Sequence, residues 1–333
     1  MQLWITLWTP CGRGGGSVAA MRGRAVWVGG GAAVAAAVVA LAAAGWGEEP
    51  GALTNWHALV LGVVQGATEL LPISSSGHLI LVPWLADWTY LEEHDAFNQT
   101  FDVALHLGTL VAVVAYFRRE IVDLLGAWLR SVGRRRVETP LERTAWVVFV
   151  ATIPAALVGA LGENLIADHL GEPWQIAINL ALFGVLLWIA DRTPERRGMA
   201  DVGPLHGLAL GLAQSLALMP GVSRSGITIT AGRFLGLDRD SAARLSFLLL
   251  VPITVGAVLF KGLTDVVLGD LPPGWEGPFL VGTLAAALSG FLAITVLLNY
   301  VRRHTYTLFV VYRLFAAAVI VLLITSGARG AGF

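Results

Sequence analysis

Two short segments rich in serine and glycine interrupt apolar stretches of this sequence. The first, residues 72–77 (PISSSG), is preceded by Glu69 and followed by His78. The second, residues 220–226 (PGVSRSG), contains Arg224. Together they supply a carboxylate, several hydroxyls, an imidazole and a guanidinium. This combination suits phosphoryl transfer, in which positioning and charge neutralisation provide most of the catalysis.

The candidate residues divide into a catalytic set and a substrate-binding set. Ionisable side chains within membrane spans are costly, which makes them functional candidates. The catalytic candidates are Glu69, Ser75, His78 and Arg224. The candidates for substrate binding are Gln65, Ser74, Ser76, Gly221, Ser223, Ser225 and Gly226.

Spacing suggests how some of these residues act. Gln65 and Glu69 are four residues apart, so they share one helix face and can present oxygens together. The glycines at 221 and 226 allow backbone N–H groups to approach an anion. We expect the following helix to begin near Ile227 and to direct its positive end toward that anion.

Each candidate also has a structural interpretation. Serines in membrane helices commonly form helix–helix contacts, Glu69 could pair with an arginine, and His78 could cap a helix. We interpret His106 as a packing or interfacial group. Asp102 lies at the water-accessible end of its span and is left out of the catalytic set. The arginines Arg233, Arg244 and Arg313 are placed nearer the inner face, where snorkelling to water is the usual arrangement.

The composition identifies the class of protein. Of 333 residues, 56% are apolar and 14% are charged, against about 25% charged in a typical soluble domain. The net charge of −1 leaves no basic face for nucleic acid. The single cysteine, Cys11, excludes an internal disulfide and a cysteine-based metal site. The sequence therefore predicts an all-α polytopic membrane protein.

Six apolar runs are long enough to cross a bilayer, since a span needs about 20 mostly apolar residues. They lie at residues 101–117, 143–161, 174–190, 242–260, 279–300 and 306–325. Two further apolar stretches, 56–85 and 206–235, contain the serine segments and are too short for two full spans. Hydrocarbon cannot satisfy the backbone groups freed by such breaks, so protein or a polar cavity must surround them. We predict two re-entrant helical hairpins.

The first 50 residues form an N-terminal extension that contains one more apolar run, residues 25–46. We predict an additional uncleaved helix there, with a cleaved secretory signal as the alternative, because Ala42–Ala44 resemble a small-residue cleavage site. The membrane domain then comprises residues 51–333.

Loop charges predict the orientation. The loop at 118–143 holds seven arginines and is assigned to the inside, whereas the loop at 87–99 is acidic and is assigned to the outside. Gln65 and the SxSG element that follows it recur 149 residues later. The two halves, about 56–190 and 205–326, therefore read as an inverted-topology repeat whose broken helices meet near the membrane midplane.

Residues 65–78 (QGATELLPISSSGH) and 220–228 (PGVSRSGIT) resemble the two signature motifs of the undecaprenyl-diphosphate phosphatase family, the bacitracin-resistance type. The similarity extends over roughly residues 56–325. It includes the FDVALHLG segment at 101–108 and the SFL segment at 246–248, and it excludes the N-terminal extension.

This resemblance implies a multi-pass enzyme of the bacterial inner membrane, with an active site opening to the outer face. Such an enzyme hydrolyses undecaprenyl diphosphate, a polyprenyl diphosphate lipid, to undecaprenyl phosphate and inorganic phosphate. This reaction recycles the lipid carrier for cell-wall synthesis. The implied cofactor is a divalent cation, Mg²⁺ or Ca²⁺. The implied partners are the lipid substrate and the bilayer, with no nucleic acid, and a homodimer is allowed.

The resemblance also implies roles for individual residues. Glu69 matches a metal-binding glutamate, Ser75 the proposed nucleophile, His78 an essential histidine, and Arg224 the arginine that holds the diphosphate. Some members have a second glutamate where this chain has Gln65. Gln65 then binds the metal through its neutral carbonyl, or Glu69 and substrate oxygens suffice.

Two questions stay open at the level of the residues. The nucleophile is Ser75, His78 or an activated water; Ser75 is close enough for a hydroxyl–imidazole contact with His78 if a helix starts after Ser76. A membrane carrier for a phosphate-like anion or a lipid phosphate is the alternative function, because inverted repeats are typical of carriers. A nucleophile with an acid/base partner would distinguish the enzyme, since a carrier needs neither.

Overall fold

The computed structural model describes residues 53–88, 95–267 and 274–331, and this part of the chain contains ten α-helices. In chain order they are α2 (Asn55–Leu70), α3 (Ser75–Ala86), α5 (Asp95–Arg134), α6 (Pro140–His169), α7 (Pro173–Ala190), α8 (Pro204–Ser215), α9 (Arg224–Phe234), α10 (Arg239–Lys261), α11 (Glu276–Val301) and α12 (Thr307–Thr325). The predicted N-terminal helix lies outside the described residues.

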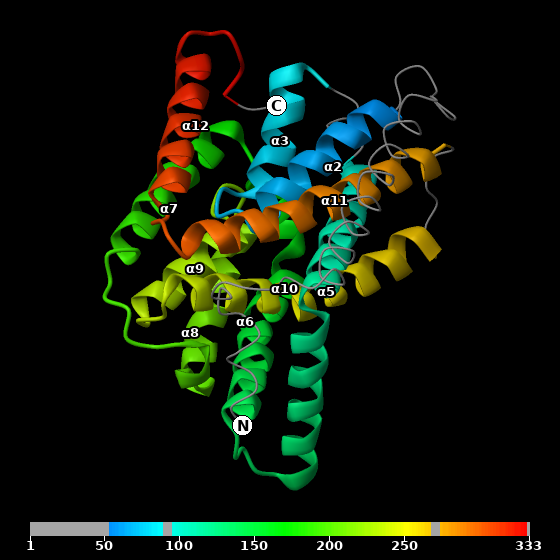
Figure 1. The fold of residues 1–333 in the computed structure, drawn as a ribbon. Helices are drawn as coiled ribbons and strands as arrows, with labels where there is room; N and C mark the ends of the chain where they lie inside the picture. The colour runs from blue at the N-terminus through cyan, green and yellow to red at the C-terminus, as the bar shows by residue number, and fades with distance from the viewer. Residues whose placement is uncertain (1–52, 89–94, 268–273, 332–333) are drawn as a thin grey trace, which may run out of the picture.

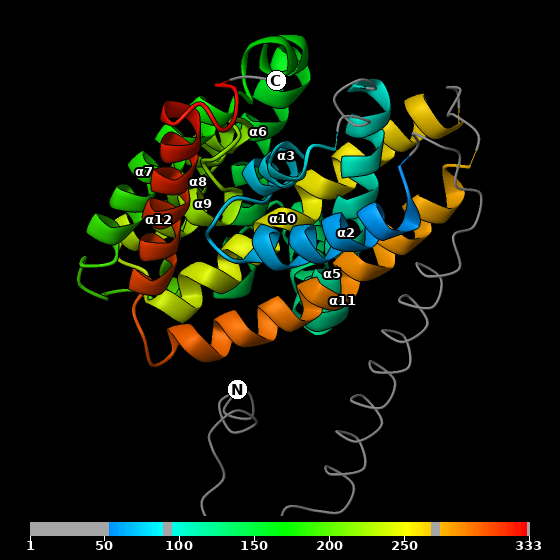
Figure 2. The same cartoon turned by 90° about the horizontal axis from the view of Figure 1, so that it is seen from above.

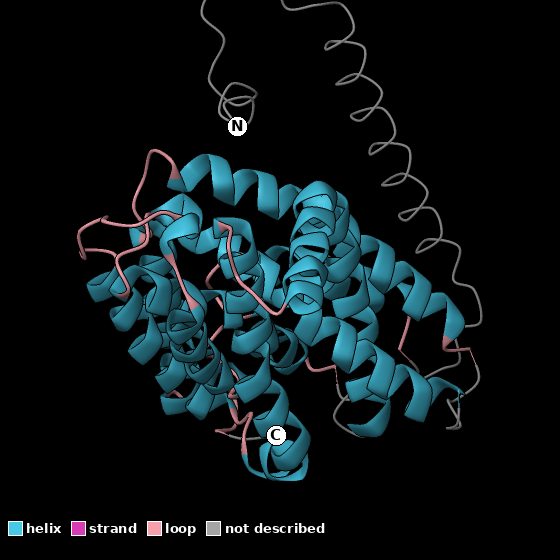
Figure 3. Cartoon of the chain, turned by 90° about the horizontal axis from the view of Figure 1, so that it is seen from below, coloured by secondary structure: helices cyan, strands magenta, loops and turns pink. Residues whose placement is uncertain are grey.

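The prediction of an all-helical chain with six membrane spans is confirmed for the described residues, which contain no β-strand (Figure 3). The helices long and apolar enough to span are α5, α6, α7, α10, α11 and α12. Large apolar side chains face outward on them: Phe315 is 66% exposed and Leu292 is 64% exposed. A chain with such a surface is a multi-pass membrane protein, because lipid rather than water covers exposed apolar faces.

The predicted loop at 118–143 is wrong in its secondary structure. Helix α5 continues through it to Arg134, with non-helical dihedral angles at Phe117. The loop was placed between the apolar runs 101–117 and 143–161, but the end of an apolar run does not by itself end a helix. Leu124 is buried and Trp128 is partly buried at helical spacing along this extension, so packing stabilises it outside the apolar span.

The short broken helices lie among the long ones (Figures 1 and 2). Helix α2 packs along α11, and α7 packs along α12. A Cβ at Gly66 of α2 would lie 2.3 Å from the carbonyl oxygen of Ala286 in α11. The two helices therefore approach closely only because glycine occupies this position. This contact fixes the position of α2 against α11, and α2 carries the candidate residues Gln65 and Glu69.

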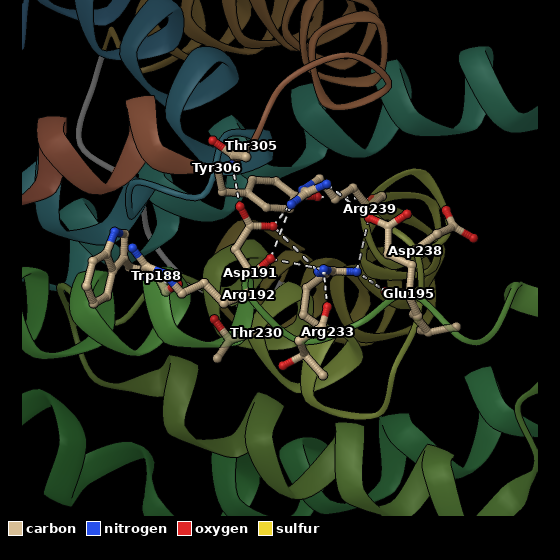
Figure 4. Close-up of polar contacts among 12 residues, drawn as sticks. Trp188, Asp191, Arg192, Glu195, Thr230, Arg233, Asp238, Arg239, Thr305 and Tyr306 are labelled. Atoms are coloured by element: carbon tan, nitrogen blue, oxygen red, sulfur yellow. Dashed lines mark hydrogen bonds and ion pairs between the residues drawn. The ribbon is translucent and has the colours of Figure 1, made fainter.

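A network of charged groups joins the end of α7 to α9, α10 and the start of α12 (Figure 4). Arg239 donates from Nε to Asp191 Oδ1 at 2.7 Å, and the Tyr306 N–H donates to Asp191 Oδ2 at 2.9 Å. Arg233 donates from Nη2 to the carbonyl oxygens of Asp191 and Thr193, at 3.1 and 2.7 Å.

The expectation that Arg233 snorkels to water is wrong, because its side chain is only 1% exposed. Snorkelling assumes that water is the nearest source of acceptors. Here the tertiary fold provides acceptors inside the protein. A cavity of about 430 Å³ adjoins this network, and its lining includes none of the candidate site residues.

Candidate active site

The two serine segments have the same local structure. Ser74 (φ 80°, ψ 97°) is the N-cap of α3, and Ser223 (φ 74°, ψ 116°) is the N-cap of α9. The Ser74 hydroxyl accepts from the Gly77 amide at 3.4 Å, and the Ser223 hydroxyl accepts from the Gly226 amide at 3.0 Å. Positive φ values are unfavourable for serine and persist only where surrounding structure holds them, commonly at functional sites.

The predicted start of the second helix near Ile227 is three residues late. Helix α9 begins at Arg224 because the Ser223 side chain caps it. Arg224 and Ser75 thus occupy the same place, the first residue of a helix that follows a break.

The two breaks contact each other directly. The Gly221 amide donates to Ser74 Oγ at 3.1 Å, and Ser225 Oγ donates to the Leu71 carbonyl oxygen at 3.0 Å. These bonds bring the N-termini of α3 and α9 together, where their positive dipole ends favour an anion.

Glu69, Ser75 and Arg224 form one buried cluster at this junction. Arg224 donates from Nε and Nη2 to Glu69 Oε1, at 3.1 and 3.0 Å, and from Nη1 to the Ser246 carbonyl oxygen at 2.9 Å. Ser75 Oγ donates to the other carboxylate oxygen, Glu69 Oε2. The side chains of Glu69 and Arg224 are 5% and 12% exposed, so little water screens the pair.

His78 does not form the expected contact with Ser75. Its Nδ1 lies 2.6 Å from the carbonyl oxygen of Ser74, and its Nε2 lies 2.6 Å from the hydroxyl of Tyr312 in α12. A carbonyl only accepts, so Nδ1 carries a proton and donates it to Ser74, while Nε2 shares a hydrogen bond with the Tyr312 hydroxyl. Among the described residues, Ser75 and His78 share no side-chain hydrogen bond, because these partners turn the imidazole away.

Gln65 is fully buried one helical turn before Glu69, and neither its Nε2 nor its Oε1 has a hydrogen-bond partner in the described part of the chain. Buried amides are normally satisfied. An amide oxygen without a partner, one helical turn before a carboxylate on the same helix, fits a hard divalent cation that takes further ligands from phosphate and water. Within the described residues, no cluster of three His, Cys, Asp or Glu side chains exists that could hold a metal by itself.

The remaining predicted binding residues lie around the junction. Gly221 has φ 92°, a value that glycine adopts without strain. A Cβ at Gly226 would lie 3.0 Å from the Ser223 Cβ. Ser225 also lies within hydrogen-bond distance of Ser223, with 3.2 Å between the two hydroxyls. Ser76 is half-buried, and its side chain makes no hydrogen bond within the described residues.

Sequence reasoning missed three residues near the site: His106, Tyr312 and Arg313. His106 Nε2 lies 3.6 Å from Glu69 Oε2, so a structural interpretation of this histidine is incomplete. Arg313 is 0% exposed, and the expectation that it snorkels is wrong. The available signal was an arginine in the middle of the last apolar span, which the rule for ionisable groups in membranes should have marked as functional. Tyr312 carried no signal of its own.

This architecture defines a polytopic helical membrane protein whose site lies where two broken helices meet around a buried Glu–Arg pair. Comparison with known proteins shows the family to which such a protein belongs. Residues 58–319 match the model of the family described as bacitracin resistance protein BacA. The chain belongs to this family.

Curated relatives match about four fifths of the chain. The chain is 48% identical to an undecaprenyl-diphosphatase of Pelobacter propionicus over 276 residues, which is 82% of this chain and 98% of the relative. It is 45% identical to an undecaprenyl-diphosphatase of Pelotomaculum thermopropionicum, over 84% of this chain and 100% of the relative. A third, from Thermomicrobium roseum, is 46% identical over 82% of this chain and 99% of the relative.

The buried Glu69–Arg224 pair should be strongly coupled. Arg224→Gln leaves the Glu69 carboxylate buried without its partner and should lower the free energy of unfolding by about 3–5 kcal/mol. Adding Glu69→Gln removes that charge and should recover part of the loss. Unfolding in detergent, followed by circular dichroism across the double-mutant cycle, measures the coupling.

Arg329→Gln is the control, because the partly exposed Arg329–Asp87 pair should contribute about 1 kcal/mol or less. Additive losses from Glu69→Gln and Arg224→Gln would show that the two side chains do not interact in the folded protein.

Proposed function

We propose that this protein hydrolyses undecaprenyl diphosphate to undecaprenyl phosphate and inorganic phosphate, as the names of its relatives suggest. The observation that carries the proposal is the hydrogen bond from Ser75 Oγ to Glu69, whose carboxylate is also held by Arg224. A carrier for a phosphate-like anion would require the arginine but not a hydroxyl bonded to a base. The geometry therefore favours the enzyme over the carrier.

Substrate binding begins with an exchange of partners at Arg224. Its planar guanidinium now holds Glu69 and can instead hold two phosphate oxygens, a geometry that arginine matches well. The adjacent N-termini of α3 and α9 add backbone N–H donors. The diphosphate thus enters a region that the fold already prepares for negative charge.

Release of Arg224 leaves Glu69 free to act as a base toward Ser75. Ser75 Oγ attacks the terminal phosphorus, its proton passes to Glu69 Oε2, and the bond from phosphorus to the bridging oxygen breaks. Undecaprenyl phosphate leaves with the electron pair. Water then attacks the phosphoserine, Glu69 returns its proton to the serine oxygen, inorganic phosphate leaves, and one proton is released to water.

The same cluster supports a divalent cation as cofactor, Mg²⁺ or Ca²⁺. Glu69 and Gln65 would hold it, with Gln65 contributing its amide oxygen, which has no partner among the described groups. When bound, the cation would neutralise and orient the diphosphate oxygens. One carboxylate with phosphate and water ligands is a common arrangement for Mg²⁺.

If Glu69 accepts the proton of Ser75, then Ser75→Ala and Glu69→Gln should each reduce kcat by about 10²–10⁴-fold, because both remove the same activated nucleophile. The double variant should be little worse than either, since residues that act as a unit are not additive. Phosphate release from a polyprenyl diphosphate by purified protein is the measurement.

Ser215→Ala is a matched control, because this half-buried serine of α8 donates within its own helix to the Gly211 carbonyl oxygen. It should keep near-normal turnover. Near-normal turnover of Ser75→Ala would remove Ser75 as nucleophile, and a trapped phosphohistidine would then identify His78.

Loss of the metal should silence the enzyme. Excess chelator should abolish phosphate release, and Gln65→Ala should raise the Mg²⁺ concentration for half-maximal rate by at least about tenfold, since it removes one ligand. Gln214→Ala is the control: Gln214 is also buried and its Oε1 also lacks a partner, but its Nε2 donates to the Ala151 carbonyl oxygen and no carboxylate follows one turn later on its helix. Full turnover in excess chelator would contradict a metal-dependent mechanism.

We further propose that α2–α3 and α8–α9 are re-entrant hairpins related by an inverted repeat. Helix α2 has 16 residues, and α3, α8 and α9 have 12, 12 and 11. At 1.5 Å per residue even the longest is about 24 Å, shorter than the roughly 30 Å hydrocarbon core. The matching serine caps and the bonds between the breaks support the repeat.

We propose that the protein lies in the bacterial inner membrane. In the proposed orientation the arginine-rich end of α5 is on the cytoplasmic side, and the active site opens to the outer face. In a Cys11→Ser background, Ala86→Cys should react with an impermeant maleimide in intact spheroplasts. Val137→Cys should react only after permeabilisation. Labelling of position 137 from outside would reverse the orientation.

A further inference from the structure

Arg313 lies in the middle of the last membrane span and is completely buried. Among the described residues it forms no ion pair with a carboxylate. A buried cation without a counter-charge is costly, and in membrane proteins such a group usually serves the function. The hydrogen bonds of Arg313 indicate its role.

All donor groups of Arg313 bond to backbone carbonyl oxygens. Nη1 donates to Pro72 at 3.3 Å and to Val222 at 3.1 Å, and Nη2 donates to Gly221 at 2.9 Å. These carbonyls belong to both breaks, which lie about 150 residues apart in the chain. Nε and Nη2 also reach two carbonyls of α7, those of Leu180 and Asn179, at 3.1 and 3.2 Å.

The surrounding packing is shaped to this side chain. A Cβ at Gly184 of α7 would lie 3.3 Å from the Arg313 Cβ, and a Cβ at Gly226 would lie 2.9 Å from Nη1. The neighbouring residue, Tyr312, holds His78 through its hydroxyl. Helix α12 therefore contacts both candidate regions through two adjacent residues.

The carbonyls held by Arg313 directly precede the catalytic side chains. Pro72 lies three residues before Ser75, and Val222 lies two residues before Arg224. A shift of either carbonyl would move the start of the corresponding helix. Only a planar guanidinium offers five donors in a fixed plane, and a lysine at this position would keep the charge but not the set of bonds.

We propose that Arg313 is a positioning residue of the active site, which holds the carbonyl oxygens of both breaks so that Ser75 and Arg224 stay aligned around Glu69. This proposal rests on the proposed hydrolysis for its kinetic consequence, but not for its structural one. Arg313 touches no reacting atom and acts through the backbone.

The test compares Arg313→Lys and Arg313→Gln with Arg233→Lys in the full-length protein. Arg233 is also buried, but it forms an ion pair and hydrogen bonds with Asp191 and Thr193 and none with the breaks. Hydrogen exchange is measured without substrate on peptides covering residues 71–78 and 219–226. The kcat and KM for a polyprenyl diphosphate are then measured per folded molecule, counted by monodisperse size-exclusion peak area.

Both Arg313 variants should exchange at least about tenfold faster in the two break peptides and should lose about 10²-fold in kcat, the cost of a misplacement near 1 Å. KM should change much less. Arg233→Lys should change neither the exchange of the breaks nor kcat. A purely structural role would reduce the yield of folded protein and leave kcat per folded molecule intact.

Unchanged kcat in Arg313→Gln would overturn the proposal. So would a loss of kcat with unchanged exchange, because Arg313 would then act through its charge. If neither Arg313 variant folds, Gly226→Ala provides the test by displacing Nη1, and unchanged exchange there would also overturn it. If the wild type hydrolyses no polyprenyl diphosphate, the proposed function fails, while the exchange result still decides whether Arg313 holds the breaks.

Discussion

A peptide group released from a helix inside a membrane finds no water to bind, so other protein groups must satisfy it. This requirement governs the centre of the molecule, where two helices are broken. Ser74 and Ser223 cap the helices that follow the breaks, and the Gly221 amide binds Ser74. The guanidinium of Arg313 binds the carbonyl oxygens of Pro72, Gly221 and Val222. Each break is satisfied partly by the other, so the two segments stabilise one another in the folded protein.

Satisfying the breaks also creates the site. The same serine caps that begin α3 and α9 place the next residues, Ser75 and Arg224, at two helix N-termini whose breaks contact each other. Glu69 balances Arg224, whereas the charge of Arg313 has no carboxylate partner within the described residues. An excess of positive charge in a water-poor region is a physical reason for an anionic ligand to bind there. The proposed diphosphate substrate meets that condition, and a neutral lipid does not.

The long spans were predictable because each depends on a property of its own residues. Twenty apolar residues must lie in hydrocarbon whatever their neighbours do, and all six predicted spans are present. The helical extension of α5 was not predicted, because Leu124 and Trp128 are stabilised by contacts with other elements rather than by apolar length. Arg233 and Arg313 were misassigned for a related reason. Whether an arginine finds its acceptors in water or in protein depends on what surrounds it in space.

The sequence by itself determined the class of protein, the spans, the two breaks and the residue types gathered at them, since these follow from local composition and motif. Only the tertiary structure decided which groups act on one another. Ser75 bonds to Glu69 rather than to His78, His78 bonds to Tyr312, and Arg313 joins both breaks. The physical reason is the distance along the chain over which each interaction is determined. Hydrophobicity and helix capping act over a few neighbouring residues, whereas a hydrogen bond depends on positions within about 3 Å that the packing of distant helices sets.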